Sequence, residues 1–278
     1  MPRSARSAVR LALPTCLALA LAASAFAQRR TSSFGRSNDD WCADARNGDH
    51  ATVCDVREST IGAAGPIEID AGRNGGISVR GWDRGDALVR ARVVAYGATT
   101  ADARRIASEV RVDTAGSVVK GEGPSTGTDR DEGWSISYEV SVPKSAMLTL
   151  DANNGGISIE TFGGTAKFHT RNGGVSLREV SGDLKGETTN GGVNVDLAGD
   201  RWDGAGLDVT THNGGITIRM PEHYSAELEV GTTHGRLDIG VPVTVQGTIG
   251  RSLTTVLGAG GARVRAVTTN GGVSVRPR

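Results

Sequence analysis

The sequence has 278 residues, and its 31 Lys and Arg residues are balanced by 31 Asp and Glu residues, so charge gives no indication of nucleic-acid or anionic-membrane binding. Glycine is abundant, at 40 residues, whereas aromatic residues make up only 4% of the chain. The absence of a Gly-X-Y period excludes collagen, and the 37% hydrophobic content excludes wholesale disorder. These values predict a folded, turn-rich, all-β chain.

The first 27 residues have the pattern of a signal peptide. Three arginines precede an apolar run, Leu11 to Ala23, and Ala25-Phe26-Ala27 matches the small-x-small pattern that signal peptidase cleaves. The run is shorter than the ~20 residues that span a bilayer. We therefore expect cleavage before Gln28, no membrane span in the mature chain, and a periplasmic or secreted protein. A lipoprotein site at Cys16 is the alternative.

Two cysteines remain after this cleavage, Cys42 and Cys54. In an oxidising compartment two nearby cysteines pair, so the sequence predicts a disulfide in an N-terminal segment spanning 28–60. Only His50 lies between them as a further histidine or cysteine ligand, which makes zinc binding the weaker reading.

A phrase of the form Asn-Gly-Gly-apolar-x-apolar dominates the rest of the chain. Its six copies begin at Asn74, Asn154, Asn172, Asn190, Asn213 and Asn270. A degenerate copy begins at His234, and from Asn154 onward the steps are 18, 18, 23, 21 and 36 residues. Periods near 20 residues with alternating apolar residues predict a single-stranded β-solenoid, or β-helix-like repeat, with coils of roughly 18–23 residues. A hairpin meander with Asn-Gly turns is the alternative.

Within such a solenoid each phrase would form a corner, because asparagine and glycine tolerate positive φ. Stacked corners would align the asparagines and the nearby threonines into ladders. We expect the solenoid to span 61–278, with an insertion at about 80–142. The insertion is predicted to hold strands at 87–96, 112–122 and 134–142 and one short helix near 101–111, capped by Thr100.

The Asn-Gly-Gly phrases, the strand from Ile77 to Asp83, the helix near Ala101 and the Val142-Pro143 pair together resemble bacterial putative-adhesin proteins. This exported family has a β-solenoid fold and no assigned function. The resemblance covers roughly Ile61 to Arg278, and it implies a fold without implying catalytic residues.

The sequence contains none of the familiar catalytic, cofactor-binding or metal-binding motifs. Stacking could bring His212 and His234 together on one edge, where Asp208 or Asp238 would complete an adventitious metal site, but polar residues on an exposed edge are the favoured explanation. The acidic loop at 196–208 is the other candidate. Its residues Asp200, Arg201, Trp202 and Asp203 are expected to form a ligand-binding lip if the tryptophan is exposed to stack on a sugar.

These observations favour an exported, non-enzymatic binding or scaffold protein of the cell envelope, adhesin-like, with glycans or envelope proteins as partners and no nucleic acid. The alternative is a carbohydrate-active enzyme with an acidic site in the 196–208 loop. The terminal Arg276-Pro277-Arg278 is expected to protect an edge strand from pairing with other chains. The oligomeric state does not follow from the sequence.

Overall fold

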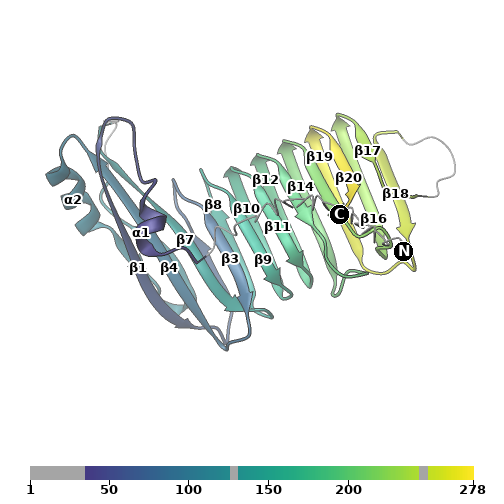
Figure 1. Ribbon diagram of the computed structural model, residues 1–278, viewed down its shortest axis with the longest axis horizontal. Coiled ribbons are helices and arrows are strands. Elements are labelled where there is room, and N and C mark those ends of the chain that lie inside the picture. Colours follow the sequence, from purple (N-terminus) through teal and green to yellow (C-terminus); the bar gives the residue numbers. More distant parts are fainter. Residues whose placement is uncertain (1–34, 126–130, 244–249) are drawn as a thin grey trace, which may run out of the picture. The chain divides into compact units, whose positions relative to one another are not determined.

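The computed structural model describes residues 35–125, 131–243 and 250–278. Within these ranges the chain forms two ten-stranded sheets and two α-helices, α1 (Asn38–Cys42) and α2 (Thr100–Glu109) (Figure 1). The predicted all-β architecture is confirmed, although α1 has no counterpart in the sequence-based prediction. The signal peptide at 1–27 and the cleavage before Gln28 lie outside the described residues. Among the described helices, none is long and apolar enough to cross a bilayer.

The first sheet contains ten strands, and its neighbours in space are mostly not neighbours in sequence. Their order is β1 (Ala51–Gly62), β4 (Asp86–Gly97), β7 (Gly133–Pro143), β3 (Ile77–Trp82), β9 (Ile157–Phe162), β11 (Val175–Val180), β13 (Val193–Asp196), β15 (Ile216–Met220), β20 (Val273–Pro277) and β17 (Leu237–Ile239).

The second sheet has the same number of strands and likewise draws its neighbours from separate parts of the chain. Their order is β18 (Ser252–Leu257), β16 (Ala226–His234), β19 (Arg263–Asn270), β14 (Gly206–Asn213), β12 (Asp183–Asn190), β10 (Thr165–Asn172), β8 (Met147–Ala152), β2 (Ile67–Asp70), β6 (Val118–Glu122) and β5 (Arg111–Asp113).

From β8 to β17, and again from β19 to β20, the chain passes back and forth between the two sheets, and equivalent strands stack in parallel. We call a strand of the second sheet together with the following strand of the first sheet a coil. Strand β18 is the exception, because it pairs antiparallel with β16. Thr165 of β10 pairs with Asp183 of β12, and Val175 of β11 pairs with Val193 of β13, so in both layers the register partners are 18 residues apart. The Asn-Gly-Gly phrase connects a strand of the second sheet to the following strand of the first sheet.

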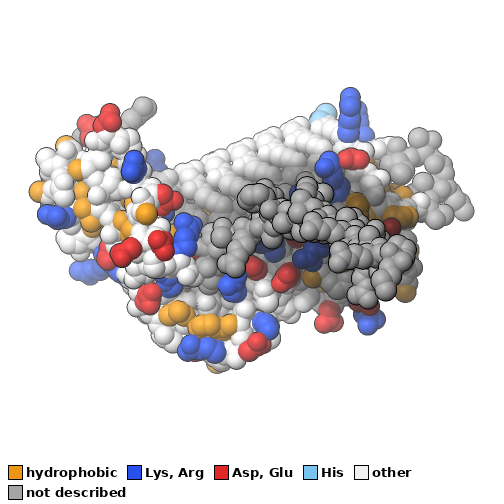
Figure 2. Space-filling model, viewed as in Figure 1, with side chains coloured by type: hydrophobic (Ala, Val, Ile, Leu, Met, Phe, Trp, Pro, Cys, Tyr) orange, Lys and Arg blue, Asp and Glu red, His pale blue; other side chains and the backbone are white. Residues whose placement is uncertain are grey.

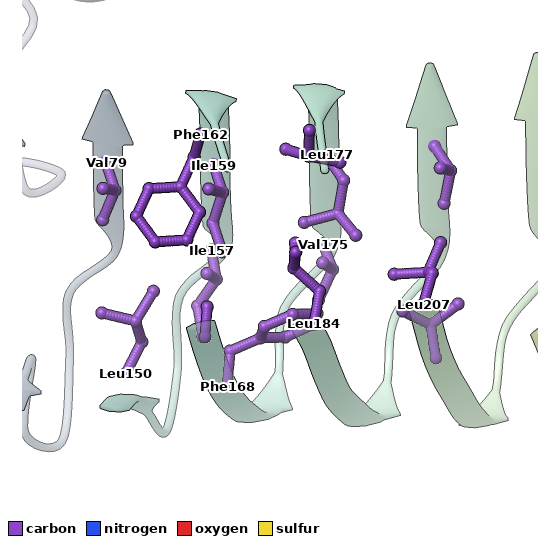
Figure 3. Close-up of a cluster of buried hydrophobic side chains, with 14 of the residues drawn as sticks. Val79, Leu150, Ile157, Ile159, Phe162, Phe168, Val175, Leu177, Leu184 and Leu207 are labelled. Carbon is purple, nitrogen blue, oxygen red and sulfur yellow. The ribbon is translucent and has the colours of Figure 1, made fainter. Parts of the chain in front are cut away.

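The core lies between the two sheets, because every second residue of each strand points inward. The burial of β10 alternates between exposed and buried residues from Thr165 to Thr170, and β9 buries Ile157 and Ile159 from the other side. Figure 3 shows these inward side chains meeting, with the Phe168 ring beside Leu184. Aliphatic residues fill most of this space, which explains how the chain forms a core with few aromatic residues.

The first glycine of most Asn-Gly-Gly phrases is required by close contact between stacked coils, and only Gly271 (φ +153°) has positive φ. A Cβ atom on Gly173 would lie 2.1 Å from the carbonyl oxygen of Gly155, which is far inside van der Waals contact. Gly191 stands in the same relation to Gly173, also at 2.1 Å. The predicted reason for these glycines, a corner with positive φ, is therefore wrong for five of the six phrases.

Two ladders of side-chain hydrogen bonds run across the stacked phrases. In the first ladder each asparagine donates its side-chain N–H to the side-chain oxygen of the asparagine one coil away, at 2.8–3.0 Å, through Asn74, Asn154, Asn172, Asn190, Asn213 and Asn270. In the second, buried threonines donate to the carbonyl of the first phrase glycine in the adjacent coil, as Thr188 does to Gly173 at 2.8 Å. The threonine bonds satisfy backbone carbonyls that the corners leave without a strand partner, whereas the asparagine bonds join side chains only.

The last coil of the sequence lies inside the stack. β19 pairs with β14 on one side and β16 on the other, and β20 likewise lies between β15 and β17. The coil formed by β16 and β17 is therefore displaced outward by residues 263–277. The expectation that Arg276–Arg278 protects an edge strand is wrong, because the edges at this end are β17 and β18. Arg278 instead donates its backbone N–H to Met220 at 2.9 Å.

At the other end of the structure, β4 and β7 of the inserted region pair antiparallel, and β1, from the segment before the insertion, pairs antiparallel with β4. Helix α2 packs Ile106 and Ala107 against Ala95 of β4, and its N-cap is Thr99, one residue before the predicted cap. The predicted strand at 112–122 is divided into β5 and β6 by a short turn. Strand β1 runs through the expected boundary at residue 60, because all twelve of its residues pair with β4.

The predicted disulfide joins Cys42 to Cys54, with 5.7 Å between the Cα atoms, and so ties α1 to β1. A second attachment is Arg90 of β4, which donates to Glu139 at 2.5 Å and to the carbonyl of Arg36 at 2.8 Å. The Arg90 guanidinium also lies over the ring of Trp41, 5.1 Å from its centroid. The short helix α1 is thus tied to the first sheet by the disulfide and, through Arg90, by the hydrogen bond to the Arg36 carbonyl and the stacking on the Trp41 ring.

Candidate binding surface

The outer face of the second sheet carries most of its side chains in straight rows, because the stacked strands share one register. One row crosses the sheet through Thr149, Lys167, Lys185, Asp208, Arg265 and Glu229. The row beside it, two residues further along each strand, runs through Asp151, His169, Glu187 and Thr210. Each coil therefore repeats the same outward positions at the spacing of neighbouring strands, about 4.8 Å.

An open hollow of about 460 Å³ lies on this face over β8, β10, β12 and β14. We call it the lysine hollow and define it by the six outward residues Asp151, Lys167, His169, Lys185, Glu187 and Thr210. Its floor is fixed from within, because Gly186 of β12 faces the core and the Phe168 ring occupies the place of a side chain there. A Cβ atom on Gly186 would lie 2.0 Å from that ring.

One side of the lysine hollow is closed by a network of ion pairs. Arg265 binds Asp208 at 2.6 Å and Glu229 at 3.1 Å, and Arg263 also binds Glu229. The hydrogen bond from Arg263, with smaller contributions from Arg265, lowers the pKa of Glu229 despite its partial burial. On the opposite side His169 Nδ1 lies 3.3 Å from Asp151. The charges of Arg265, Asp208 and Glu229 are thus already paired within the protein.

Three charges of the hollow form no ion pair with another described residue: Lys167, Lys185 and the exposed carboxylate of Glu187. The two lysines are direct register partners on adjacent parallel strands, and both are exposed. Within the described ranges neither ammonium forms an ion pair or a side-chain hydrogen bond, whereas Lys144 binds Asp83 at 2.8 Å. Two unpaired like charges side by side repel each other, so this position favours an anionic group from outside.

The face of the first sheet has a different character. Its outward rows are a strip of hydroxyl and amide residues and a ladder of alternating charge, in which Arg80 and Arg178 both bind Glu160, at 3.3 and 3.2 Å. Figure 2 shows a white area along the upper part of the middle strands, and charged side chains lie lower in this view. Because Arg80 and Arg178 are both paired with Glu160, this part of the face offers a flat polar surface rather than a charged site.

The structure alters the predicted lip at 200–203. Trp202 is only 4% exposed, belongs to the core and donates its indole N–H to Gly182 at 3.0 Å. The expectation of an exposed tryptophan for sugar stacking is therefore wrong. Asp200, Arg201 and Asp203 do line an open hollow of about 510 Å³ together with Glu179. This arrangement brings carboxylates together without an aromatic surface.

The two histidines considered as metal ligands are separated by a strand. His234 pairs with Asn270 of β19, while β19 has β14, the strand of His212, on its other side. The residues described by the structure contain no group of three or more His, Cys, Asp or Glu side chains arranged to hold a metal. The insertion of β19 is the physical reason that these histidines do not adjoin.

Reasoning from the sequence missed the lysine hollow. A signal for it does exist: Lys167 and Lys185 stand three residues before Thr170 and Thr188, at the same position of successive 18-residue units. Aligning the units on their threonines would have placed the two lysines side by side. An alignment of units could not show that Asp208 in the next coil is already bound by Arg265, because Arg265 belongs to β19, which comes later in the sequence but lies beside β14.

Three comparisons place the chain among known proteins. The family model described as Toastrack DUF4097 matches residues 110–276, and no curated protein matches. A solved "putative cell adhesion protein" from Clostridium sporogenes is 10% identical, with a TM-score of 0.41, covering 81% of this chain and all of its own. For a "putative adhesin" from Bacteroides fragilis the identity is 11%, the TM-score 0.35 and the coverages 81% and 97%.

A "putative lipid binding protein" from Parabacteroides distasonis is 9% identical with a TM-score of 0.27, covering 80% of this chain and 96% of its own. The predicted resemblance to bacterial putative-adhesin proteins is confirmed. Since the family model spans more than half of the sequence, the chain belongs to the Toastrack DUF4097 family.

Proposed function

We propose that this protein is a non-enzymatic binding protein of the bacterial cell envelope, periplasmic or secreted after removal of residues 1–27, which holds acidic glycans on the outer face of its second sheet. The observation that carries the proposal is the unpaired Lys167–Lys185 couple in the lysine hollow. Carboxylate or phosphate groups on a sugar chain would neutralise two adjacent ammonium groups. Protein partners of the envelope with a comparable acidic strip would use the same contacts.

A β-solenoid with coils of 18–23 residues supports this role. Stacking would repeat equivalent outward positions at a regular spacing, so a polymer lying across the coils would meet several weak contacts at once. Multivalent contact of this kind gives useful avidity from individually weak sites. The threonines at both ends, Thr149 and Thr210, add hydroxyl groups that donate and accept hydrogen bonds with sugar hydroxyls.

The test is binding of polygalacturonate, an acidic polysaccharide, compared with neutral dextran, by isothermal titration at low salt. We expect binding to polygalacturonate only, weakened at least tenfold in the double variant Lys167→Gln, Lys185→Gln. Lys144→Gln is the matched control, because that lysine is bound to Asp83 outside the hollow. Equal binding by the double variant and the control, or absence of binding to the acidic polymer, would overturn the proposal.

The alternative of a carbohydrate-active enzyme rests on the hollow at Asp200 and Asp203. Because Trp202 is buried, this hollow has no aromatic ring on which a sugar could stack. A reducing-end assay on the same polysaccharides separates the two functions. Release of new reducing ends that is abolished by Asp200→Asn and Asp203→Asn would establish the enzyme. Binding without release is the outcome expected of the binding protein.

A further inference from the structure

Strand β18 forms one edge of the second sheet and differs in composition from the strands beside it. Its sequence, Ser-Leu-Thr-Thr-Val-Leu, has neither a charge nor a proline. The neighbouring strand β16 carries Glu227 and Glu229, and the longest other edge strand, β1, carries Asp55, Arg57 and Glu58. Charges and prolines are the usual means by which proteins prevent edge strands from pairing, and β18 lacks both.

The register of β18 shows which of its backbone groups point to the open edge. Thr232 donates its N–H to the carbonyl of Arg251 at 2.8 Å, so these opposite residues form a hydrogen-bonded pair. Because such pairs alternate in an antiparallel ladder, Leu253, Thr255 and Leu257 bond toward β16. Ser252, Thr254 and Val256 therefore direct their N–H and C=O groups away from the sheet.

Hydrophobic exposure coincides with this edge. The Val256 side chain is 66% exposed, and among the described residues only Met147, at 47%, is a second large hydrophobic residue with comparable exposure. Met147 starts β8 in the interior of the sheet, paired with Thr165, whereas Val256 belongs to the edge. Among the described residues, β18 is thus an uncharged edge with an exposed valine and three residues whose outward backbone groups have no strand partner, and such an edge is suited to accept another strand.

We propose that the partner is a second copy of this chain, paired antiparallel through β18 about a two-fold axis at Thr254. The strand is compatible with itself, because pairing brings no like charges together, and an isologous contact closes at a dimer. With Thr254 opposite its own copy, Ser252 faces Val256 of the second copy. The three hydrogen-bonded pairs that result, one at Thr254 and two between Ser252 and Val256, contribute six backbone hydrogen bonds and cover both valines.

The dimer makes a functional difference, because it joins two second sheets edge to edge. The two outer faces then form one continuous surface with a lysine hollow on each side of the axis. The inference does not depend on what the hollow binds, and it is tested without any ligand.

The test is sedimentation equilibrium of the whole protein, wild type and three variants of one residue. We expect a dimer for wild type and for Thr254→Val, which keeps the N–H. Thr254→Pro, which removes it, and Thr254→Lys, which opposes two ammonium groups on the axis, should each weaken dimerisation at least tenfold. Proline is tolerated at an edge when its nitrogen faces solvent, so the Thr254→Pro monomer should keep its far-UV circular dichroism. Thr254→Lys retains the backbone N–H and preserves the test if the proline variant unfolds.

Cross-linking checks the register independently. Residues of a hydrogen-bonded antiparallel pair lie about 5.5 Å apart at Cα, within disulfide range. Mild oxidation should therefore cross-link Thr254→Cys into a covalent dimer and leave Ser252→Cys unlinked. A wild-type protein that stays monomeric at high concentration, a Thr254→Lys variant that dimerises like wild type, or equal cross-linking of both cysteine variants would overturn the proposal.

Discussion

Replacing Gly173 with alanine tests the close stacking of coils on which the fold depends. The new Cβ atom would lie 2.1 Å from the Gly155 carbonyl oxygen, so the two coils must separate locally by about 1 Å to reach the closest separations that real structures show. The Gly155 carbonyl also accepts the Thr170 hydroxyl at 2.7 Å, and this bond would lengthen with the shift.

The expected cost is the sum of two effects. Overpacking of a tight interior contact costs about 1–3 kcal/mol, and loss of a buried hydrogen bond adds about 1 kcal/mol. We therefore expect Gly173→Ala to lower the free energy of unfolding by about 3 kcal/mol. With an m-value of about 2 kcal/mol/M, the urea midpoint would fall by about 1.5 M.

The measurement is urea unfolding followed by far-UV circular dichroism. Gly65→Ala is the matched control, because a Cβ atom there meets nothing within 4 Å and the residue does not have positive φ. The control should stay within about 0.5 kcal/mol of wild type, as surface substitutions usually do. The close-contact argument would be refuted if both alanine variants unfolded at the same urea concentration.

Three further predictions concern other parts of the structure. Trp202→Ala should lower the free energy of unfolding by about 3–5 kcal/mol in the same urea experiment, because it empties a buried site; a loss below 1 kcal/mol would mean that the indole lies outside the core. Deleting Arg276–Arg278 should lower the thermal midpoint in calorimetry without producing larger oligomers, because Arg278 donates to Met220 and binds Glu179; an unchanged midpoint would contradict the interior position. Burial, with a smaller effect of Asp70, raises the pKa of Tyr138 above its ordinary value of 10.0, so the stability due to its neutral form is complete below pH 10 and is lost as pH rises further. Absorbance at 295 nm should show fewer ionised tyrosines in the folded than in the urea-unfolded protein at pH 11, and less so in Tyr138→Phe; identical titrations would refute this.

The sequence was sufficient to predict alternation, because an inward residue at every second position is a local property of each strand. The disulfide and helix α2 could also be predicted, because each depends on residues that lie close together in the sequence. The order of the coils was not, because β19 is as good a neighbour for β14 as β16 is, and only the assembled structure selects between them. The left-handed backbone conformations of Thr161 (φ 54°) in β9 and Glu179 (φ 53°) in β11 were also not predicted, since neither residue type indicates such a backbone.

The candidate site divides in the same way. Aligned repeats contain the proximity of Lys167 to Lys185, but the burial of Trp202 depends on a hydrogen bond to Gly182, twenty residues away on another coil. A tryptophan among charged residues in a loop looks exposed to any local pattern. Its position is decided by whether the neighbouring coil offers a carbonyl within reach, as Gly182 does while it also accepts the Gly206 N–H, and this is a property of the stack.

The position of β19 and β20 between earlier coils has a consequence for how the chain reaches its folded state. Because synthesis proceeds from the N-terminus, residues 226–239 become available before residues 263–277. In the folded protein, however, it is the later segment that pairs with β14 and β15. The earlier segment has the same alternation and the same threonine and glycine at its corner, so it could pair with β14 and β15 until the later segment is made. Maturation would then require one coil to give way to another, a strand-exchange step whose rate pulse-labelled hydrogen exchange at β14 could measure.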